Sequence, residues 1–317
     1  MSGDYLMDRN ICKICGNNKN NETYVVKERM INRGDRFHYL YCSKCKTLQL
    51  TDTVQNLASF YPMNYEPFQK RIKSNHIPLW IKDIYVYIMS RITLPEFVKL
   101  LYRRFGKSGV AELYKTAVDR KCKVLDVGAG NGTFGKQLKE LGFSYVKCVD
   151  LYCMTPLYSD IDFINGDIFD VDGKFDFITL HHSFEHMHEP SKILAKVRDL
   201  LSDDGLCLIR IPVSNSSAWE EYHENWYQID APRHLYLYST KAMNLLCSEA
   251  GLIIEKIIFD SNPDQFYISK AYRDTNDSLF EIKSKRGIIL SLKYLHKAFH
   301  ANRTDKGDQA CFYIRKK

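Results

Sequence analysis

The stretch KCKVLDVGAGNGTFGKQL, residues Lys121–Leu138, decides the fold of this chain. Its first part, Lys123–Val127, is a short apolar run that carries one acid, Asp126, and it predicts a buried strand. Three glycines follow within five residues, which lets the backbone turn sharply and approach a ligand closely. Apolar residues then recur at helical spacing up to Gly142. Such a loop between a parallel strand and a helix holds a nucleotide-like cofactor, so we expect an α/β fold.

The sequence of this loop is compatible with two kinds of cofactor. The segment Gly130–Gly135 matches the dinucleotide pattern GxGxxG, but that short pattern is weak on its own. S-adenosylmethionine (SAM) is the alternative, because acids follow three successive predicted strands, at Asp126, Asp150 and Asp167. Carboxylates suit a ligand with a cation and many donors, whereas they would repel two phosphates. We expect Asp126 to bind the amino-acid part of SAM, Asp150 the ribose hydroxyls and Asp167 the adenine amino group.

The chain resembles class I SAM-dependent methyltransferases over roughly Val118–Cys207. The resemblance lies in five segments in the same order: VLDVGAGNGTFG, VDLY, GDIFD, KFDFITLHHSFEHMHEP and DDGLCLIRIP. It implies a SAM-dependent enzyme with a Rossmann-like, seven-stranded sheet whose last strand is antiparallel. The predicted cofactor-binding residues are Asp126, Gly128, Ala129, Gly130, Asn131, Gly132, Asp150, Leu151, Asp167, Ile168 and His181.

Four of the ten cysteines form two CxxC pairs, Cys12 with Cys15 and Cys42 with Cys45, separated by 26 residues. This is a two-knuckle spacing, somewhat longer than in the shortest zinc ribbons, and four thiolates would hold a structural Zn²⁺ with no open position. The alternative is two redox or disulfide pairs. A glycine follows the first pair, where a knuckle needs a positive φ, but Lys46 follows the second. The other six cysteines are scattered along the chain, and we predict that they are reduced residues of the core.

The chain divides into three predicted regions. Residues 1–52 form the zinc-ribbon-like domain, with strands at 23–27 and 37–41. Residues 53–112 are rich in aromatic and basic side chains, with helices expected at 77–90 and 95–105. We interpret them as a helical cover on the catalytic domain; a membrane- or glycan-binding surface and a single-stranded nucleic-acid surface are alternatives.

Residues 113–317 form the predicted SAM-binding domain. It has insertions at about 212–236, which we expect to be irregular, and 262–302, which we expect to be polar and helical. Between them the sequence predicts a helix capped by Ser239 and a strand at 252–259. A β-rich segment at 310–315 suits the last strand of the sheet.

The chain is also similar to a narrower group, sugar methyltransferases with an N-terminal zinc-binding domain from deoxysugar and surface-polysaccharide pathways. The segments ICKICG, YCSKCKTLQL and DAPRHLYLYS carry this similarity. C-methyltransferases of the group have a glutamate–histidine pair where this chain has Arg233–His234, and a tyrosine where it has Ala231. The resemblance therefore implies that His234 is the general base. Because the glutamate and tyrosine are missing, we favour O-methylation slightly over C-methylation.

The candidates for catalysis gather after the fourth predicted strand and after the fifth. A sugar hydroxyl is a poor acid, so its methylation needs a base. The predicted catalytic residues are His234, His186, His182 and Glu185, and the predicted substrate-binding residues are Arg233, Tyr227 and Tyr236. Arg233 suits a substrate phosphate, with a surface ion pair as the alternative. Alternatively, Glu185 and His186 brace their loop. For His234 the alternatives to catalysis are binding the substrate and a structural, bracing role. We see no carboxylate cluster that would indicate a Mg²⁺ site.

Composition is that of a globular enzyme of 317 residues, 45% hydrophobic, with a net charge of +7. The charge favours an anionic partner, and we expect an anionic carbohydrate substrate and no DNA; peripheral membrane contact stays open. We find no signal peptide and no run of roughly 18 apolar residues, so we expect a cytoplasmic protein. A small phenol or quinone as acceptor, or a non-catalytic scaffold that binds RNA or glycan, are the alternative functions.

Overall fold

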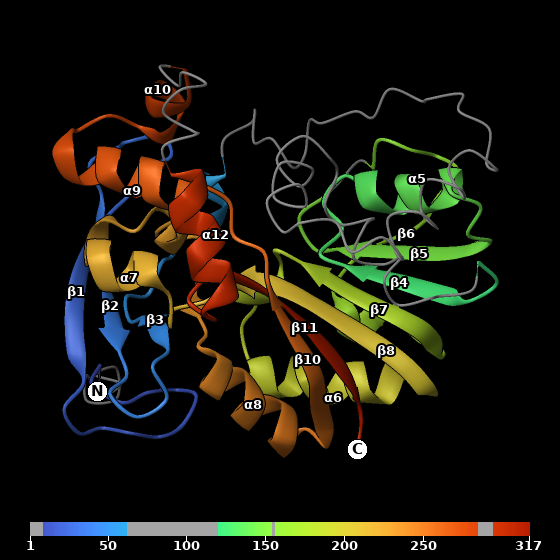
Figure 1. The fold of residues 1–317 in the computed structure, drawn as a ribbon. Helices are drawn as coiled ribbons and strands as arrows, with labels where there is room; N and C mark the ends of the chain where they lie inside the picture. Colours follow the sequence, from blue (N-terminus) through green and yellow to red (C-terminus); the bar gives the residue numbers. More distant parts are fainter. Residues whose placement is uncertain (1–8, 62–119, 154–155, 285–293) are drawn as a thin grey trace, which may run out of the picture.

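The computed structural model describes residues 9–61, 120–153, 156–284 and 294–317 (Figure 1). The helices expected at 77–90 and 95–105, and most of the predicted cover region, lie outside these ranges. In the described ranges, no helix combines the length and the hydropathy that crossing a bilayer requires.

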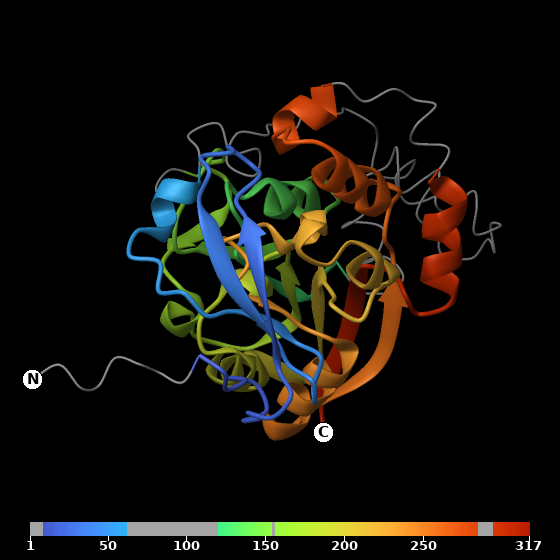
Figure 2. The ribbon, with the colours of Figure 1, turned by 90° about the vertical axis from the view of Figure 1, so that its left-hand side faces the viewer.

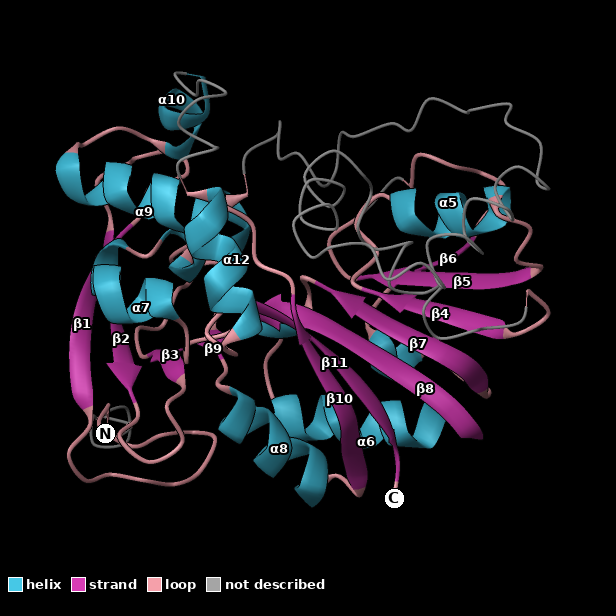
Figure 3. Ribbon diagram, in the orientation of Figure 1, coloured by secondary structure: helices cyan, strands magenta, loops and turns pink. Residues whose placement is uncertain are grey.

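The larger sheet has seven strands, and its topology confirms the predicted class I fold (Figure 3). The spatial order is β10-β11-β8-β7-β4-β5-β6. Strands β4 to β8 pair in parallel, whereas β11 is antiparallel to both of its neighbours, β8 and β10. The strands are β4 (Lys123–Val127), β5 (Tyr145–Asp150), β6 (Asp162–Asn165), β7 (Phe175–His181), β8 (Leu201–Pro212), β10 (Leu252–Phe259) and β11 (Gln309–Lys316).

Helices cover both faces of this sheet, because successive strand residues point to opposite sides and both sides are apolar. Val124 packs in one cluster with Leu138 of α5 (Thr133–Glu140). Leu125 packs in the other with Leu194 of α6 (Pro190–Leu200). Helix α8 (Thr240–Glu249) lies beside α6 on that second face (Figure 3) and begins at the predicted cap, where Ser239 Oγ accepts a hydrogen bond from Ala242 N (3.0 Å).

A smaller antiparallel sheet holds the N-terminal residues, and Figure 2 shows its first strands in blue across the front of the molecule. Strands β1 (Glu22–Lys27) and β2 (Arg36–Tyr41) confirm the predictions, and β3 (Leu48–Leu50) follows them. The fourth strand, β9 (Tyr236–Leu237), comes from the far half of the chain and pairs with β3. No pattern in the sequence predicted this strand.

The two insertions are largely helical. Residues 212–236 were expected to be irregular, and this was wrong in part: they contain α7 (Ser217–Tyr222) and the 3₁₀ turns η4 (His223–Asn225) and η5 (Tyr227–Ile229). Helix α7 forms because Ser216 caps it and Trp219 and Tyr222 bury their rings. The second insertion holds α9 (Asp264–Asp274), α10 (Leu279–Ser284) and α12 (Leu295–Arg303).

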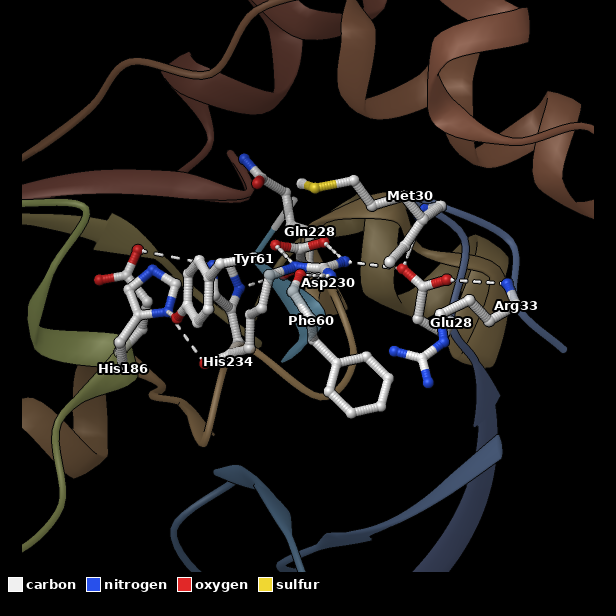
Figure 4. A network of polar contacts seen from close by, with 12 residues as sticks. Glu28, Met30, Arg33, Phe60, Tyr61, His186, Gln228, Asp230 and His234 are labelled. Carbon is white, nitrogen blue, oxygen red and sulfur yellow. Dashed lines mark hydrogen bonds and ion pairs between the residues drawn. The ribbon is translucent and has the colours of Figure 1, made fainter. Parts of the chain in front are cut away.

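A buried arginine, Arg233, joins the two sheets. Figure 4 labels three residues that it contacts, Glu28, Phe60 and Asp230. The fully buried Arg233 donates from Nη2 to Glu28 Oε1 (3.1 Å), and Glu28 follows β1. Its Nε and Nη2 also donate to the Asp230 carboxylate (2.9 and 2.6 Å), and its Nη1 donates to the carbonyl of Phe60 (2.8 Å). Burial opposes ionisation of Asp230, but the guanidinium outweighs burial and holds the pKa of that carboxyl below its usual value.

Removing this guanidinium would leave the buried carboxylate of Glu28 and the partly buried carboxylate of Asp230 without their countercharge. We expect Arg233→Met to lower the free energy of unfolding by about 3–5 kcal/mol, measured by urea denaturation. Arg273→Met is the matched control, because Arg273 pairs with Asp274 at the surface and its loss should cost at most about 1 kcal/mol. Equal effects of the two variants would contradict the role given to Arg233.

Candidate functional site

The glycine loop at the end of β4 has the sharp turns that its sequence predicts. Gly128, Gly130 and Gly132 all have positive φ, at 71°, 56° and 81°. The Gly128 amide donates to the carbonyl of Val149 (2.9 Å), which ties the loop to β5. A side chain at position 128 has no room, because its Cβ would lie 2.3 Å from Cβ of Ser183. The loop therefore needs glycine there for conformation and for space.

Gly128→Ala tests the loop. The added methyl would displace Ser183 or the loop itself, so we expect the affinity for SAM, measured by calorimetry, to fall at least about 10-fold. Gly173→Ala is the matched control: Gly173 also has a positive φ (102°), but nothing lies within 4 Å of its added Cβ. That variant should lose about 1–2 kcal/mol of stability and keep its SAM affinity. An unchanged affinity in the Gly128 variant would show that the loop does not hold the cofactor.

Asp150 links the glycine loop to the end of β5. Its Oδ2 accepts a hydrogen bond from Gly130 N (2.8 Å), and its Oδ1 accepts from the amides of Tyr152 and Cys153 (both 2.9 Å). Burial raises the pKa of Asp150, and these three amides oppose that rise. A carboxylate offers about four acceptor positions, so one remains for a ribose hydroxyl. Asp150 therefore both shapes the loop and keeps capacity for the cofactor.

Asp126 is the residue whose surroundings best fit a positively charged cofactor. The residue is 2% exposed. Burial, with a smaller contribution from the charge of Asp150, raises its pKa to about 8. A cationic ligand would restore the charged form of Asp126, whereas a pyrophosphate would meet two buried carboxyls. The donor set therefore fits SAM and disfavours a dinucleotide.

The raised pKa of Asp126 predicts a pH-dependent stability. Since the folded-state pKa of about 8 lies above the ordinary 3.8, the stabilising contribution is complete below about pH 4. It is lost as the pH rises through about 8, with a slope of up to about 1.4 kcal/mol per pH unit. Asp126→Asn should flatten this fall in urea unfolding of the cofactor-free protein, whereas Asp203→Asn, at an exposed site, should not. Parallel curves for Asp126→Asn and the wild type would refute the assignment.

The remaining predicted cofactor residues lie at the same edge, where β5, β6 and β7 end. Asp167 caps the 3₁₀ turn η2 (Ile168–Asp170), because its Oδ1 accepts from Phe169 N (2.7 Å). Asn131 is buried, and its Oδ1 accepts from Thr133 N (3.0 Å) at the start of α5. Ile168 is buried, whereas Leu151 is 53% exposed and offers an apolar surface beside Asp150. His181 ends β7, with its ring centroid 5.2 Å from that of Phe134.

Glu185, His186 and His234 form a second group, called here the Glu185 cluster. Glu185 and His186 lie in the 3₁₀ turn η3 (Phe184–His186), directly after β7, and His234 precedes β9. The two imidazole rings meet edge to face, 4.6 Å apart, and His234 Nε2 lies 3.9 Å from Glu185 Oε1. One potential ligand atom from each of the three residues lies within 4.8 Å of the others. The structure thus brings together three of the four predicted catalytic residues.

Backbone carbonyls determine the protonation of both rings. His186 Nδ1 lies 2.9 Å from the carbonyl of Arg233, and His234 Nδ1 lies 2.7 Å from that of Gln228 (Figure 4). A carbonyl can only accept a hydrogen bond, so both Nδ1 atoms carry a proton. Burial, followed by the charge of His234, lowers the pKa of His186, which keeps that ring neutral near pH 7. With a proton at Nδ1, the lone pair of the neutral form of either ring is at Nε2.

Glu185 is completely buried. Burial raises its pKa, but the neighbouring imidazoles of His182, His186 and His234, in their protonated forms, outweigh burial and lower it to about 2. His182, the fourth predicted catalytic residue, lies at the rim: its φ is 50°, its Nδ1 is 3.4 Å from Glu185 Oε1, and its Nε2 contacts Arg210 Nη1 (2.5 Å). The two nitrogens of the partly exposed His182 ring already contact Glu185 and Arg210. We therefore assign His182 to holding the Glu185 carboxylate in place.

The predicted substrate-binding roles of Arg233 and Tyr236 are wrong. Arg233 is fully buried in the junction described above, so it cannot reach a substrate phosphate. Tyr236 is buried in β9 and stacks on Tyr238, with ring centroids 5.5 Å apart. Tyr227 is partly buried and packs against the apolar cluster of Ile268, Tyr272 and Ile282. Tyr61 was not among the predicted site residues, because its segment was interpreted only as part of the helical cover. Its hydroxyl lies 3.3 Å from His186 Nδ1.

The four paired cysteines meet in space. The Sγ atoms of Cys12 and Cys45 are 3.5 Å apart, as are those of Cys15 and Cys42, and all four lie within 4.8 Å of one another. A tetrahedral zinc with bonds of about 2.3 Å needs sulfurs about 3.8 Å apart, so the group can hold this ion. Lys46 takes the left-handed conformation (φ 64°) that glycine takes at position 16 (φ 67°), so the departure at position 46 leaves the knuckle intact.

A pocket of about 370 Å³ lies outside both groups. It is lined by Val25, Lys27, Arg29, Arg36, Glu224, Asn225 and Asn276, on β1, β2, η4 and the loop before α10. Its lining is basic, but it includes no residue of the glycine loop or of the Glu185 cluster.

Comparison with known proteins decides the family. A family model described as a methyltransferase domain matches residues 96–257, about half of the chain. The chain belongs to this methyltransferase family. The methyltransferase is SAM-dependent, and the glycine loop and the acids at the strand ends lie within the matched residues. Comparison with curated proteins finds no match.

Among solved structures, the methyltransferase is similar to a SAM-dependent methyltransferase from Archaeoglobus fulgidus (17% identity, 74% of this chain, 99% of that chain, TM-score 0.44). It is also similar to a structure from Galdieria sulphuraria described as a candidate sarcosine dimethylglycine methyltransferase (18% identity, 75% and 98%, TM-score 0.46). A third is the O-methyltransferase of a Brevibacillus brevis polyketide synthase with S-adenosyl-L-homocysteine (14%, 79% and 82%, TM-score 0.45). At these scores the likeness carries no inference about the acceptor.

Proposed function

We propose that this methyltransferase methylates a hydroxyl of an anionic carbohydrate, either a nucleotide-linked sugar or a surface glycan. The observation that carries the proposal is the Glu185 cluster: two imidazoles with Nδ1 held by carbonyls stand beside a buried carboxylate, at the end of β7. This arrangement supplies the base that a weakly acidic hydroxyl needs. The order of the CxxC pairs, the catalytic domain and the DAPRHLYLYS segment supports a sugar as acceptor.

The side chains divide the chemistry between them. SAM, when bound, supplies an activated methyl group. Asp126 would hold the cationic amino-acid part of the cofactor and Asp150 a ribose hydroxyl. His234 Nε2 would take the proton of the acceptor hydroxyl, and the ionised Glu185, 3.9 Å away, would stabilise the resulting imidazolium. Backbone carbonyls keep both rings oriented throughout.

We further propose that the four paired cysteines hold a structural Zn²⁺, which would leave no open position for chemistry. The second knuckle contacts the catalytic domain directly. Ser239 Oγ donates to the carbonyl of Cys45 (2.5 Å), and Ser214 Oγ donates to that of Lys46 (2.5 Å). An ion that orders this knuckle would therefore also order the start of α8.

Incubation with isotope-labelled SAM tests the acceptor class. A mass-spectrometric screen of nucleotide sugars, lipid-linked glycans, small phenols and quinones should find the label on a sugar hydroxyl. His234→Ala should lower the turnover of that acceptor by about 10²–10⁴-fold with little change in SAM affinity. His188→Ala, an exposed position in the same region, is the control and should retain turnover. Labelling confined to phenols or quinones, or normal turnover by His234→Ala, would refute the proposal.

A further inference from the structure

The carboxylate of Glu185 has no partner that explains its burial. Its side chain is 0% exposed, and neither oxygen accepts a hydrogen bond from any residue that the structure describes. The nearest imidazole nitrogens are His182 Nδ1 at 3.4 Å and His234 Nε2 at 3.9 Å. A buried carboxyl group whose oxygens accept no hydrogen bond is strongly unfavourable unless an ion or another partner compensates it.

The two histidines are arranged as metal ligands usually are. A ligating histidine donates its other ring N–H to a backbone carbonyl or a carboxylate, which fixes the tautomer and turns the free nitrogen toward the ion. His186 and His234 both do this, through the carbonyls of Arg233 and Gln228. The 3.9 Å between His234 Nε2 and Glu185 Oε1 is also compatible with one shared ion, because two ligands at about 2.1 Å span at most about 4.2 Å.

We propose that Glu185, His186 and His234 bind a divalent transition-metal ion, with Zn²⁺ as the probe ion. Two imidazoles and one carboxylate suit such an ion better than Mg²⁺, which prefers oxygen ligands. Three protein ligands leave positions open, unlike the four cysteines of the ribbon. The chain would then carry two metal sites of different chemistry.

An open coordination position gives the ion a role in the reaction, and this part rests on the proposed function. A sugar hydroxyl bound there would have a lowered pKa and would release its proton to solvent before accepting the methyl group. In the metal-loaded enzyme the Nε2 of His234 is a ligand, and the ion takes over from the imidazole in activating the acceptor.

Metal content of the purified full-length protein tests the site without SAM or acceptor. After incubation with excess Zn²⁺ and removal of free ion, mass spectrometry should find two zinc ions per wild-type chain and one per chain of Glu185→Gln or His186→Gln. His188→Ala should keep two, because this exposed histidine lies outside the cluster. Cys12→Ser should lose the other ion. In calorimetry, Glu185→Gln should weaken the cluster's Zn²⁺ affinity at least about 100-fold.

Thermal unfolding separates loss of the site from loss of the fold. Added Zn²⁺ should raise the Tm of the wild type and of His188→Ala above that of the ribbon-loaded protein, and should not raise that of Glu185→Gln. If Glu185→Gln does not fold, His186→Gln provides the same comparison. A wild type that binds only the ion lost in Cys12→Ser, with no cluster-dependent binding, would overturn the inference. Binding of the second ion by a protein that methylates no carbohydrate would support this inference and refute the proposed function alone.

Discussion

The buried guanidinium of Arg233 is the interaction on which the arrangement of this methyltransferase depends. It neutralises Glu28 beside the N-terminal sheet and Asp230, which lies four residues before His234. The backbone of the same segment completes the arrangement: the carbonyl of Arg233 accepts from His186, and the carbonyl of His234 accepts from Tyr39 of β2 (2.8 Å). One short segment thus sets the position of both imidazoles, and its own position is set by charges that water cannot screen.

The N-terminal element with the four paired cysteines contacts the same segment of the chain. Its last strand, β3, pairs with β9, which begins two residues after His234. The serine contacts to the second knuckle extend this connection to α8. The four-cysteine group and the Glu185 cluster are therefore connected by a short series of contacts through the small sheet.

The two groups of acids at the edge of the larger sheet have opposite electrostatics. At the glycine loop, Asp126 and Asp150 are buried close to each other, and burial raises the pKa of both. At the end of β7, Glu185 is just as buried, but surrounding histidines lower its pKa to about 2. A bound cation would favour the charged forms of the first group, whereas the imidazoles of the second group already favour the charged form of Glu185. The first environment suits the sulfonium of SAM, and the second would suit the proposed hydroxyl acceptor, which needs a base.

The sequence by itself determined the parts of this protein that depend on local pattern. The apolar runs of the core sheet, the glycine turns, the acids at the strand ends and the Ser239 cap all follow from residue type and spacing, and they fold as predicted. The cap at Ser216 carried a comparable signal for α7 that was not used. Only the tertiary structure decided the role of Arg233, the two-residue strand β9 and the meeting of His186 with His234. These depend on pairings between residues far apart in the chain: Arg233 with Glu28, and Leu237 with Leu48. No local periodicity encodes such contacts, because their free energy comes from burial that exists only once the two sheets have met.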